Sequence, residues 1–310
     1  MRILFMGTPD FAIPSLRILL EHDYTVVSVV TAPDRPRGRG QEIAFSPIKE
    51  FALGRKLPVL QPENLKDPEF TAAVKALQPD LIVVVAFRIL PKEVFSIPSL
   101  GSFNLHASLL PKYRGAAPMN WAIMNGDAET GVTTFFLQEK VDTGSVILQA
   151  RVRIGPDETA GELHDTLADV GAEIVLQTVR LIERRAVILR QQNDSQATPA
   201  PKIFKDDCRI DWRQPSLRVH NFVRGLSPYP CAWTTHGGKV LRIYRTQLSQ
   251  DPVAQRKAPG TVVEVTRKSL RVGTADGTIA ILEIQQEGRK RMEVEEFLRG
   301  YPLKHDEQFT

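Results

Sequence analysis

Leu81-Ile82-Val83-Val84-Val85-Ala86-Phe87 is the longest run of apolar residues in this chain. It is far too short to span a bilayer, and an unbroken run rich in β-branched residues is typical of a strand buried on both faces. Similar runs occur at Arg2–Met6 and Thr25–Thr31, and segments with helical spacing of apolar residues separate them. Strands that alternate with helices in this way predict an α/β fold with a Rossmann-like parallel sheet.

The same alternation continues as far as residue 189. We expect further strands at Val59-Leu60, Ser102–His106, Val132–Leu137 and Val146–Ile154. We expect helices from Thr8 to Leu20, Ser46 to Arg55, Pro68 to Leu77, Ala117 to Asn125 and Ala160 to Arg184. Residues 1–189 are therefore predicted to form one α/β domain, covered by helices on both faces of its sheet.

The C-terminal part of the chain has a different pattern. Residues 190–204 are polar and contain two prolines, as expected of a linker. After a predicted helix at Leu217–Val223, short strands follow at 232–235, 240–244, 260–264, 269–272 and 279–284, with turn signals such as Asp276-Gly277 between them. Short strands of this kind predict a small barrel of the OB type in residues 205–310, an architecture common among nucleic-acid-binding domains.

Charge is distributed unevenly between these regions. Residues 205–310 carry 18 Lys and Arg against 13 Asp and Glu, whereas the first 204 residues carry 22 against 23. A basic module attached to a near-neutral body suggests a polyanionic partner, although an excess of this size also falls within the ordinary variation of protein surfaces. Both interpretations stay open on charge alone.

Composition excludes several classes of protein. Hydrophobic residues make up 42% and charged residues 25%, which is typical of a globular protein and not of a disordered one. The two cysteines, Cys208 and Cys231, have no metal-ligand spacing, so neither a disulfide framework nor a zinc site is predicted. The apolar run at Arg2–Met6 is too short for a secretory signal. We expect a cytoplasmic protein with no membrane association, and nothing in the sequence requires more than a monomer.

Three polar residues suggest catalysis. Asn104 and His106 are two residues apart in a predicted strand, and the period of 2 places them on the same face. An amide can donate to a developing oxyanion, and an imidazole can carry protons near neutral pH. Asp142 follows in a turn between two apolar runs. Each has a structural explanation by itself, because Asn ends strands, buried His satisfies backbone groups and Asp-Thr-Gly is an ordinary turn. Together they suit transfer of an acyl-like group to an amine.

Two loops bear on the ligand class. The turn Gly7-Thr8-Pro9-Asp10-Phe11 has one glycine where a dinucleotide fingerprint needs three, which argues against a nicotinamide or flavin cofactor. Arg35-Pro36-Arg37-Gly38-Arg39-Gly40 interleaves arginines with proline and glycine, a pattern that suits phosphate contacts or a solvated surface loop. Alongside a basic C-terminal module, contact with nucleic acid is the better interpretation.

A set of motifs extends over essentially the whole chain. It comprises Gly7–Phe11, Pro33–Pro36, Gly38–Gly40, Asn104–His106, Ser108–Pro111, Arg114–Pro118, Gly126–Thr133, Asp142–Gly144, Arg209–Trp212, Pro259–Thr261 and Gly288–Met292. With these motifs the chain resembles the methionyl-tRNA formyltransferases, which belong to the folate-dependent formyltransferases. The strand motif and the Asp-Thr-Gly turn are common to all folate-dependent formyltransferases of this fold, whereas the arginine loop and the C-terminal module point to the tRNA-specific members.

The resemblance implies a reaction and a role for each catalytic candidate. The formyl group of 10-formyltetrahydrofolate would move to the α-amino group of methionine on initiator tRNA, a free amine with a pKa of about 7.7–8.0. Asn104 and His106 would hydrogen-bond the formyl oxygen as negative charge develops on it. Asp142 would orient His106 and hold a water that relays the proton of the amine to the departing folate nitrogen. This chemistry needs no metal.

The resemblance also implies the binding residues. The folate pocket would be lined by Ser108, Leu109, Leu110 and Pro111 together with the turn Phe87, Arg88, Ile89 and Leu90. The tRNA would be bound by Arg35, Arg37, Arg39, Lys290 and Arg291, with Arg39 expected to contribute most. The chain departs from the family pattern at three places. Phe87–Leu90 stands where Tyr-Gly and one more residue are common, Tyr113 replaces a common Trp, and Lys140 stands where a Gly often precedes the Asp-Thr-Gly turn.

Other functions remain as alternatives. A folate-dependent formyltransferase acting on another amine, such as a nucleotide-linked amino sugar, would share Asn104, His106 and Asp142, and so would a formyltetrahydrofolate hydrolase. Neither would need a basic loop and a basic barrel. A nucleic-acid-binding protein with a silent α/β domain would have no chemical use for the three polar residues.

Overall fold

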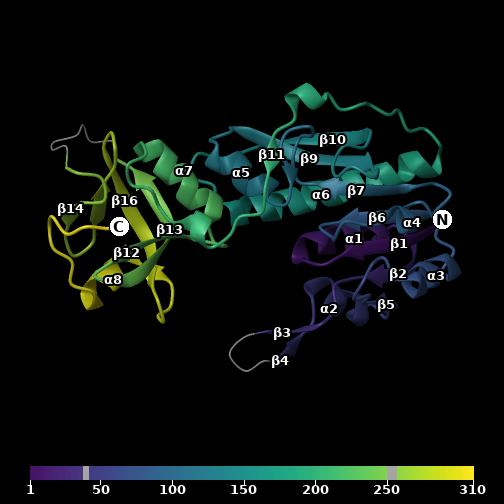
Figure 1. Cartoon of the computed structure of the whole chain (residues 1–310), viewed down its shortest axis with the longest axis horizontal. Coiled ribbons are helices and arrows are strands. Elements are labelled where there is room, and N and C mark those ends of the chain that lie inside the picture. Colours follow the sequence, from purple (N-terminus) through teal and green to yellow (C-terminus); the bar gives the residue numbers. More distant parts are fainter. Residues whose placement is uncertain (38–41, 250–256) are drawn as a thin grey trace. The chain divides into compact units, whose positions relative to one another are not determined.

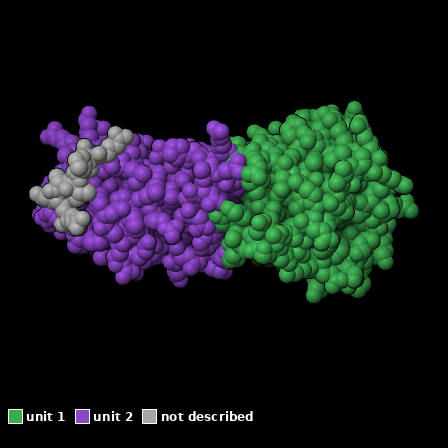
Figure 2. All heavy atoms as spheres, turned by 90° about the horizontal axis from the view of Figure 1, so that it is seen from above, with its two compact units in different colours: residues 1–115, 131–152, 164–199 green, residues 116–130, 153–163, 200–310 purple. Residues whose placement is uncertain are grey.

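The computed structural model describes residues 1–37, 42–249 and 257–310 (Figure 1). The chain divides into two compact units (Figure 2). Unit 1 comprises residues 1–115, 131–152 and 164–199, and unit 2 comprises residues 116–130, 153–163 and 200–310. Unit 2 therefore contains two short segments from the first half of the sequence as well as the C-terminal region.

Unit 1 is built on a seven-stranded sheet with the order β10-β9-β7-β6-β1-β2-β5. Its strands are β1 (Arg2–Gly7), β2 (Thr25–Val30), β5 (Val59–Leu60), β6 (Leu81–Val85), β7 (Ser102–His106), β9 (Glu129–Phe136) and β10 (Val146–Arg153). The pairings from β7 through β6, β1 and β2 to β5 are all parallel. This confirms the Rossmann-like parallel sheet. Strand β9 runs antiparallel to β7, a reversal that the apolar runs do not reveal.

The central strands are covered on both faces. Leu4, Ile82 and Val84 pack with residues of the helices α3 (Pro68–Ala76) and α4 (Lys92–Phe95) in one buried cluster. Their chain neighbours Phe5 and Val83 point to the other face and are also fully buried. This two-sided burial is the reason that these strands read as continuous apolar runs.

The other helices of the α/β region begin at recognisable signals. They are α1 (Ile13–Glu21), α2 (Pro47–Gly54), α5 (Pro118–Met124) and α6 (Ala160–Glu183). The side chain of Ser46 caps α2 by accepting from the N–H of Lys49, and Asp67 caps α3 in the same way. In both helices proline occupies the first position, where its missing N–H costs nothing. The sequence predicts five of the six helices α1 to α6, with bounds that differ by a few residues, and misses the four-residue helix α4.

The carboxyl ends of the parallel strands meet at one edge of the sheet. Gly7 ends β1 there, the turn at Ala86 follows β6, and Ala107 follows β7. The arginine segment follows β2 at the same edge as a hairpin of β3 (Arg35–Arg37) and β4 (Glu42–Ala44), where the sequence predicts only a loop. Ligands of open α/β sheets bind at this edge. The fold thus brings the sequence-predicted binding segments of unit 1 to one end of its sheet.

Unit 2 contains an antiparallel sheet with the order β12-β13-β16-β15-β14. Its elements are α7 (Ser216–Leu226), β12 (Ala232–His236), β13 (Lys239–Leu248), β14 (Val262–Val265), β15 (Leu270–Gly273), β16 (Thr278–Gln286), β17 (Met292–Glu293) and α8 (Val294–Gly300). Helix α5 belongs to this unit and packs on α7, where the side-chain amide of Asn120 donates to the carbonyl of Gly225 at 2.7 Å.

The C-terminal residues join the two edge strands of this sheet. The N–H of Val262 donates to the carbonyl of Glu307, and the N–H of Phe309 donates to the carbonyl of Gly260. On the other side, Thr310 and Thr235 exchange both backbone hydrogen bonds, at 2.8 and 2.9 Å. Residues 306–310 thereby link both edges of the antiparallel sheet and close it, and the assignment of this domain to the OB type stays a prediction.

Phe309 tests the importance of this closure. Its side chain is 2% exposed and packs against Trp212, so Phe309→Ala is expected to lower the free energy of unfolding by about 3–5 kcal/mol. The matched control is Phe204→Ala, since Phe204 is 61% exposed and its loss should cost at most about 0.5 kcal/mol. All three tryptophans lie in unit 2, so urea unfolding followed by tryptophan fluorescence reports on this unit. Equal midpoints for the two variants would contradict a role of Phe309 in closing the sheet.

Three further features concern membrane spans, cysteines and metal ligands, which the sequence analysis also considers. Within the described ranges, no helix is both long and apolar enough to cross a membrane. Cys208 and Cys231 are free and buried, and burial raises the pKa of each thiol to about 11. The same part of the chain holds no group of three or more His, Cys, Asp or Glu side chains placed to bind a metal ion.

Candidate active site

Asn104 and His106 lie near the carboxyl end of β7, on the same face of the sheet. The residue between them, Leu105, packs against α6 at Gly171, where a Cβ would lie 2.7 Å from the Leu105 side chain. The two polar side chains therefore face away from α6. Asn104 pairs with Val84 of β6, and His106 pairs with Thr133 of β9. Asn104 is half-buried, whereas His106 is only 6% exposed.

One nitrogen of His106 is fixed by the backbone. Its Nε2 lies 2.8 Å from the carbonyl oxygen of Tyr113, and a carbonyl only accepts, so Nε2 carries a proton. Its Nδ1 faces Asp142, with 3.9 Å between Nδ1 and Oδ2. This separation exceeds a direct hydrogen bond but permits an electrostatic interaction. Nδ1 is therefore the nitrogen of His106 that can exchange a proton in the site.

Asp142 is held in a constrained turn. Its backbone φ is 55°, in the left-handed region that Asp tolerates better than most residues, and its Oδ2 accepts from the N–H of Gly115 at 2.9 Å. Gln192 fixes the backbone of the turn, since its side-chain amide donates to the carbonyls of Asp142 and Gly144 at 2.9 and 2.8 Å. The carboxylate is thus aimed at His106 by contacts from two distant parts of unit 1.

A charged pair supports Gln192 in turn. Arg114 donates from Nε and Nη2 to the side-chain oxygen of Gln192, and its Nη2 also lies 2.6 Å from Asp194. The hydrogen bonds from Arg114 hold the pKa of the Asp194 carboxyl below its usual value. Sequence analysis assigns Gln192 and Asp194 to a linker and misses this role. One sign of this role is present in the sequence: Arg114 is the first residue of a family motif, and its charge requires a partner elsewhere in the chain.

Gly144 permits the turn to approach strand β9. A Cβ at this position would lie 1.7 Å from the carbonyl oxygen of Phe136, a backbone atom that cannot move aside. Gly144→Ala is therefore expected to lower the free energy of unfolding by about 1–3 kcal/mol and to displace Asp142. Gly54→Ala is the control, because a Cβ there meets nothing within 4 Å and the residue ends a helix. The free energies of unfolding are measured by urea unfolding followed by circular dichroism. If Gly144→Ala and Gly54→Ala both matched the unmodified protein, the close approach at Gly144 would not constrain the turn.

The segment Ser108–Pro111 is fixed by its own hydrogen bonds. Thr133 donates from its hydroxyl to the carbonyl of Ser108 at 2.6 Å and accepts from the N–H of Leu110 at 3.1 Å. Leu110 is buried, whereas Leu109 and Pro111 are half-buried. The segment directly follows β7, so the fold places it next to His106 in the chain with a defined backbone. Its contact with folate stays a prediction.

The turn Phe87–Leu90 follows β6, the parallel neighbour of β7. Arg88 anchors this turn by donating to the carbonyls of Pro62 and Glu63 at 2.7 and 3.0 Å, and it lies over the ring of Phe87. Burial lowers the pKa of the Arg88 guanidinium. Ile89 is 73% exposed. The departure from the family pattern at Arg88 therefore replaces a small residue by an anchor to the segment before α3.

The basic candidates occur in both units. Arg35 and Arg37 belong to β3 in unit 1, where Arg35 is exposed, and Arg39 lies outside the described residues. Lys290 and Arg291 belong to unit 2. Lys290 forms an ion pair with Glu296 at 3.2 Å, and Arg291 is paired with Glu283. Both C-terminal cations therefore have carboxylate partners within the protein.

Comparisons with known proteins agree with this architecture. Residues 1–179 match the family described as formyl transferase, and residues 202–302 match the formyl transferase C-terminal domain. The chain is 48% identical over 310 residues to the methionyl-tRNA formyltransferase of Bacteroides fragilis, and the match covers 98% of this chain and 96% of that protein.

Solved structures share the fold at low sequence identity. HypX from Aquifex aeolicus in complex with tetrahydrofolic acid is 21% identical with a TM-score of 0.66; the match covers 100% of this chain but only 50% of that one. An N-formyltransferase from Helicobacter canadensis, in complex with folinic acid and dTDP-3-aminofucose, is 20% identical with a TM-score of 0.67, and the match covers 90% and 98% of the two chains. On the evidence of the full-length sequence match, this chain belongs to the methionyl-tRNA formyltransferases.

Proposed function

We propose that this protein transfers the formyl group of 10-formyltetrahydrofolate to the α-amino group of methionine on initiator tRNA, giving formylmethionyl-tRNA for translation initiation. The observation that carries this proposal is the similarity to a methionyl-tRNA formyltransferase over nearly the whole chain, with both family regions matched. The arrangement of Asn104, His106 and Asp142 supplies groups that suit such a transfer.

The reaction forms one bond and breaks another at the formyl carbon. The free amine attacks this carbon, negative charge develops on the formyl oxygen, and the bond to the folate nitrogen then breaks. In our proposal the amide of Asn104 and the doubly protonated ring of His106 donate to that oxygen. His106 donates through Nδ1, because its Nε2 is already committed to the carbonyl of Tyr113, and the facing carboxylate of Asp142 favours this protonated form. Preorganised donors of this kind stabilise the transition state without a reorganisation cost.

Asp142 serves the proton transfer in this proposal. The amine loses a proton when it attacks, and the folate nitrogen gains one when it leaves, so the step is balanced within the two substrates. Asp142 would hold a relaying water and keep His106 oriented, roles that fit a carboxylate fixed by the N–H of Gly115 and facing Nδ1 at 3.9 Å.

The binding residues are proposed from the same resemblance. Folate would contact the segments Ser108–Pro111 and Phe87–Leu90, which follow two adjacent parallel strands and so end at the same edge of the sheet. The tRNA would contact Arg35 and Arg37 of β3, and Arg39, which lies outside the described residues. It would also contact the C-terminal pair Lys290 and Arg291, which would exchange their carboxylate partners for phosphates. Action as a monomer in the cytoplasm stays a prediction from the sequence.

A formyl-transfer assay tests the function directly. The protein is supplied with 10-formyltetrahydrofolate and, in parallel, charged initiator tRNA, free methionine, a nucleotide-linked amino sugar, or buffer alone. Fast transfer to the charged tRNA and not to the other acceptors is the expected result. Preferred transfer to the amino sugar, or hydrolysis in buffer, would show that charged tRNA is not the acceptor, whereas the use of 10-formyltetrahydrofolate as formyl donor would still hold.

Arg39→Ala separates tRNA binding from chemistry. Loss of one charge-assisted contact to phosphate, worth about 1.5–3 kcal/mol, is expected to raise the KM for charged tRNA by about 10- to 100-fold with little change in kcat. Arg184→Ala removes the same charge from an exposed position in unit 1 and serves as control. A matching rise in the KM for 10-formyltetrahydrofolate, or an equal loss in kcat, would mean instead that the loop serves the catalytic centre.

A further inference from the structure

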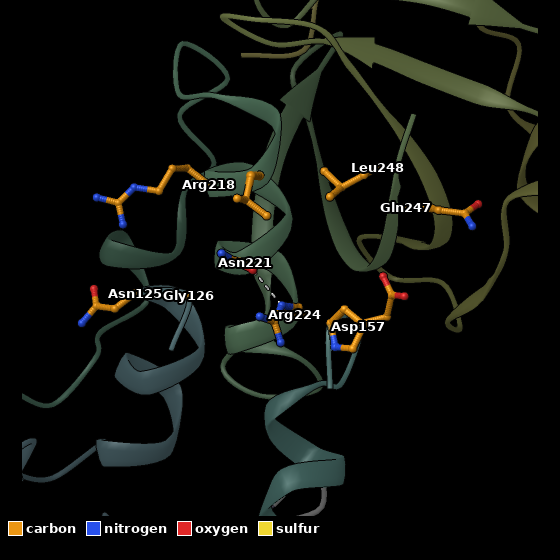
Figure 3. A pocket seen from close by; sticks show the side chains of 10 residues that line it. Asn125, Gly126, Asp157, Arg218, Asn221, Arg224, Gln247 and Leu248 are labelled. Carbon is orange, nitrogen blue, oxygen red and sulfur yellow. Dashed lines mark hydrogen bonds between the residues drawn. The ribbon is translucent and has the colours of Figure 1, made fainter. Parts of the chain in front are cut away.

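Unit 2 contains a pocket of about 540 Å³ that none of the proposed binding residues lines (Figure 3). Its walls come from the end of α5, from the segment before α6, from α7 and from the end of β13, all of which belong to unit 2. A volume of this size is in the usual range for sites that bind small molecules or single groups of larger ones.

Two side chains of α7 that line this pocket are almost completely buried. Arg224 is 6% exposed and Asn221 is 4% exposed, and Figure 3 shows them side by side, joined by a hydrogen bond from Nε of Arg224 to Oδ1 of Asn221. Nη1 of Arg224 donates to the carbonyls of Gly155 and Glu158 at 3.1 and 3.0 Å. These contacts hold the guanidinium rigidly.

Both side chains keep unused donors. Among the described residues, neither Nη2 of Arg224 nor Nδ2 of Asn221 has a hydrogen-bond acceptor. Neither atom is a fully buried unpaired donor, so both remain accessible to water and to a ligand. Since both residues line the pocket, a ligand with acceptor oxygens would satisfy them.

The charges of the pocket favour an anion. Arg224 and the exposed Arg218 both line it, and neither has a carboxylate within 4 Å in the described part of the chain. Burial lowers the pKa of the Arg224 guanidinium, and the charges of Asp157 and Glu158 oppose this effect. One carboxylate, Asp157, also lines the pocket, but it lies 3.2 Å from Nε2 of His220. Unlike Lys290 and Arg291, the two arginines therefore form no ion pair within 4 Å in the described part of the chain, although Asp157 and Glu158 act on Arg224 from a greater distance.

We propose that this pocket binds a phosphate group, held by Nη2 of Arg224 and Nδ2 of Asn221 at its floor and by Arg218 at its mouth. The planar guanidinium of Arg224 has N–H groups at the spacing of phosphate oxygens. Because its hydrogen bonds already hold it in place, the side chain loses little conformational entropy when a phosphate binds. The proposal rests on the proposed function, because a tRNA substrate carries a phosphate on every nucleotide. A free nucleotide has the same chemistry, and the experiment separates the two sources.

The main variant is Asn221→Asp in the full-length protein. It is nearly isosteric and keeps the oxygen that accepts from Arg224, so the fold should be retained, but it places a negative charge where the phosphate would bind. Arg218→Ala removes the exposed cation, and Arg267→Ala removes one exposed cation elsewhere in unit 2 as the matched control. Each protein is titrated with uncharged tRNA at several salt concentrations and, separately, with AMP, by calorimetry.

Asn221→Asp and Arg218→Ala are expected to weaken tRNA binding by about 10- to 100-fold, and Arg218→Ala should reduce the salt slope by about one unit. Arg267→Ala should change neither quantity by more than about twofold. AMP binding lost in Asn221→Asp with unchanged tRNA binding would assign the site to a free nucleotide. If both ligands bind both variants as they bind the unmodified protein, the pocket is not a phosphate site. The formyl-transfer assay on the unmodified protein decides the proposed function independently.

Discussion

His106→Gln is expected to lower kcat for formyl transfer by about 10³-fold or more, with KM for tRNA nearly unchanged. A glutamine amide can still donate to the carbonyl of Tyr113 in place of Nε2, so the local structure is preserved. The variant lacks Nδ1, and with it both an oxyanion donor, worth about 10²–10³-fold, and a proton carrier, worth about 10²–10⁴-fold. Single-turnover kinetics with saturating 10-formyltetrahydrofolate would measure the chemical step.

His164→Gln is the control for this experiment. His164 lies in the same unit, 3.5 Å from Asp10, and is not part of the proposed mechanism. The control should keep its rate within a few-fold of the unmodified protein. A His106→Gln variant that folds and turns over at a comparable rate would refute the proposed role of Nδ1.

Asp142→Asn is expected to lower kcat by about 10²–10³-fold, which is the second largest effect. The amide oxygen of asparagine can still accept from the N–H of Gly115, and asparagine tolerates the left-handed backbone at φ 55°. The change therefore removes the charge beside His106 and the base character of the carboxylate while retaining the turn.

The control for Asp142→Asn is Asp165→Asn, since the Asp165 side chain is 85% exposed and has no part in the proposed mechanism. Thermal unfolding of both variants should match that of the unmodified protein. The rate is then measured against pH, because loss of a proton relay changes the shape of the profile whereas a merely structural defect lowers it uniformly. A uniformly lowered profile for Asp142→Asn would mean that the residue only supports the turn.

Much of unit 1 could be predicted from local sequence. The strand Ser102–His106 has the bounds that the sequence predicts, because Phe103 and Leu105 alternate with polar residues at the period of a strand. Proline at the first position of α2 and α3 marks the start of those helices equally clearly. These signals are local: they depend on backbone preferences and on burial of a strand on both faces.

The remaining features depend on contacts between distant residues. The antiparallel direction of β9 is set by its pairing with β7 at the end of the long connection through residues 107–128, and the composition of β9 does not indicate it. The hydrogen bonds of Gln192 to the carbonyls of Asp142 and Gly144 link positions about fifty residues apart, and a polar linker gives no sign of them. The closing of the sheet by residues 306–310 is equally invisible, since few of these residues favour a strand.

The role of Gln192 has a consequence for recombination between related genes. A crossover placed where the composition changes, near residue 190, would exchange Gln192 and Asp194 together with the incoming C-terminal module. The carbonyls of the Asp142 turn and the guanidinium of Arg114 would then depend on the residues that the incoming sequence supplies at positions 192 and 194. A crossover after residue 199 keeps Gln192 and Asp194 with the turn that they support, but it still separates residues 116–130 and 153–163 from the rest of unit 2. Chimeras joined after residue 199 should therefore preserve the Asp142 turn better than chimeras joined near residue 190.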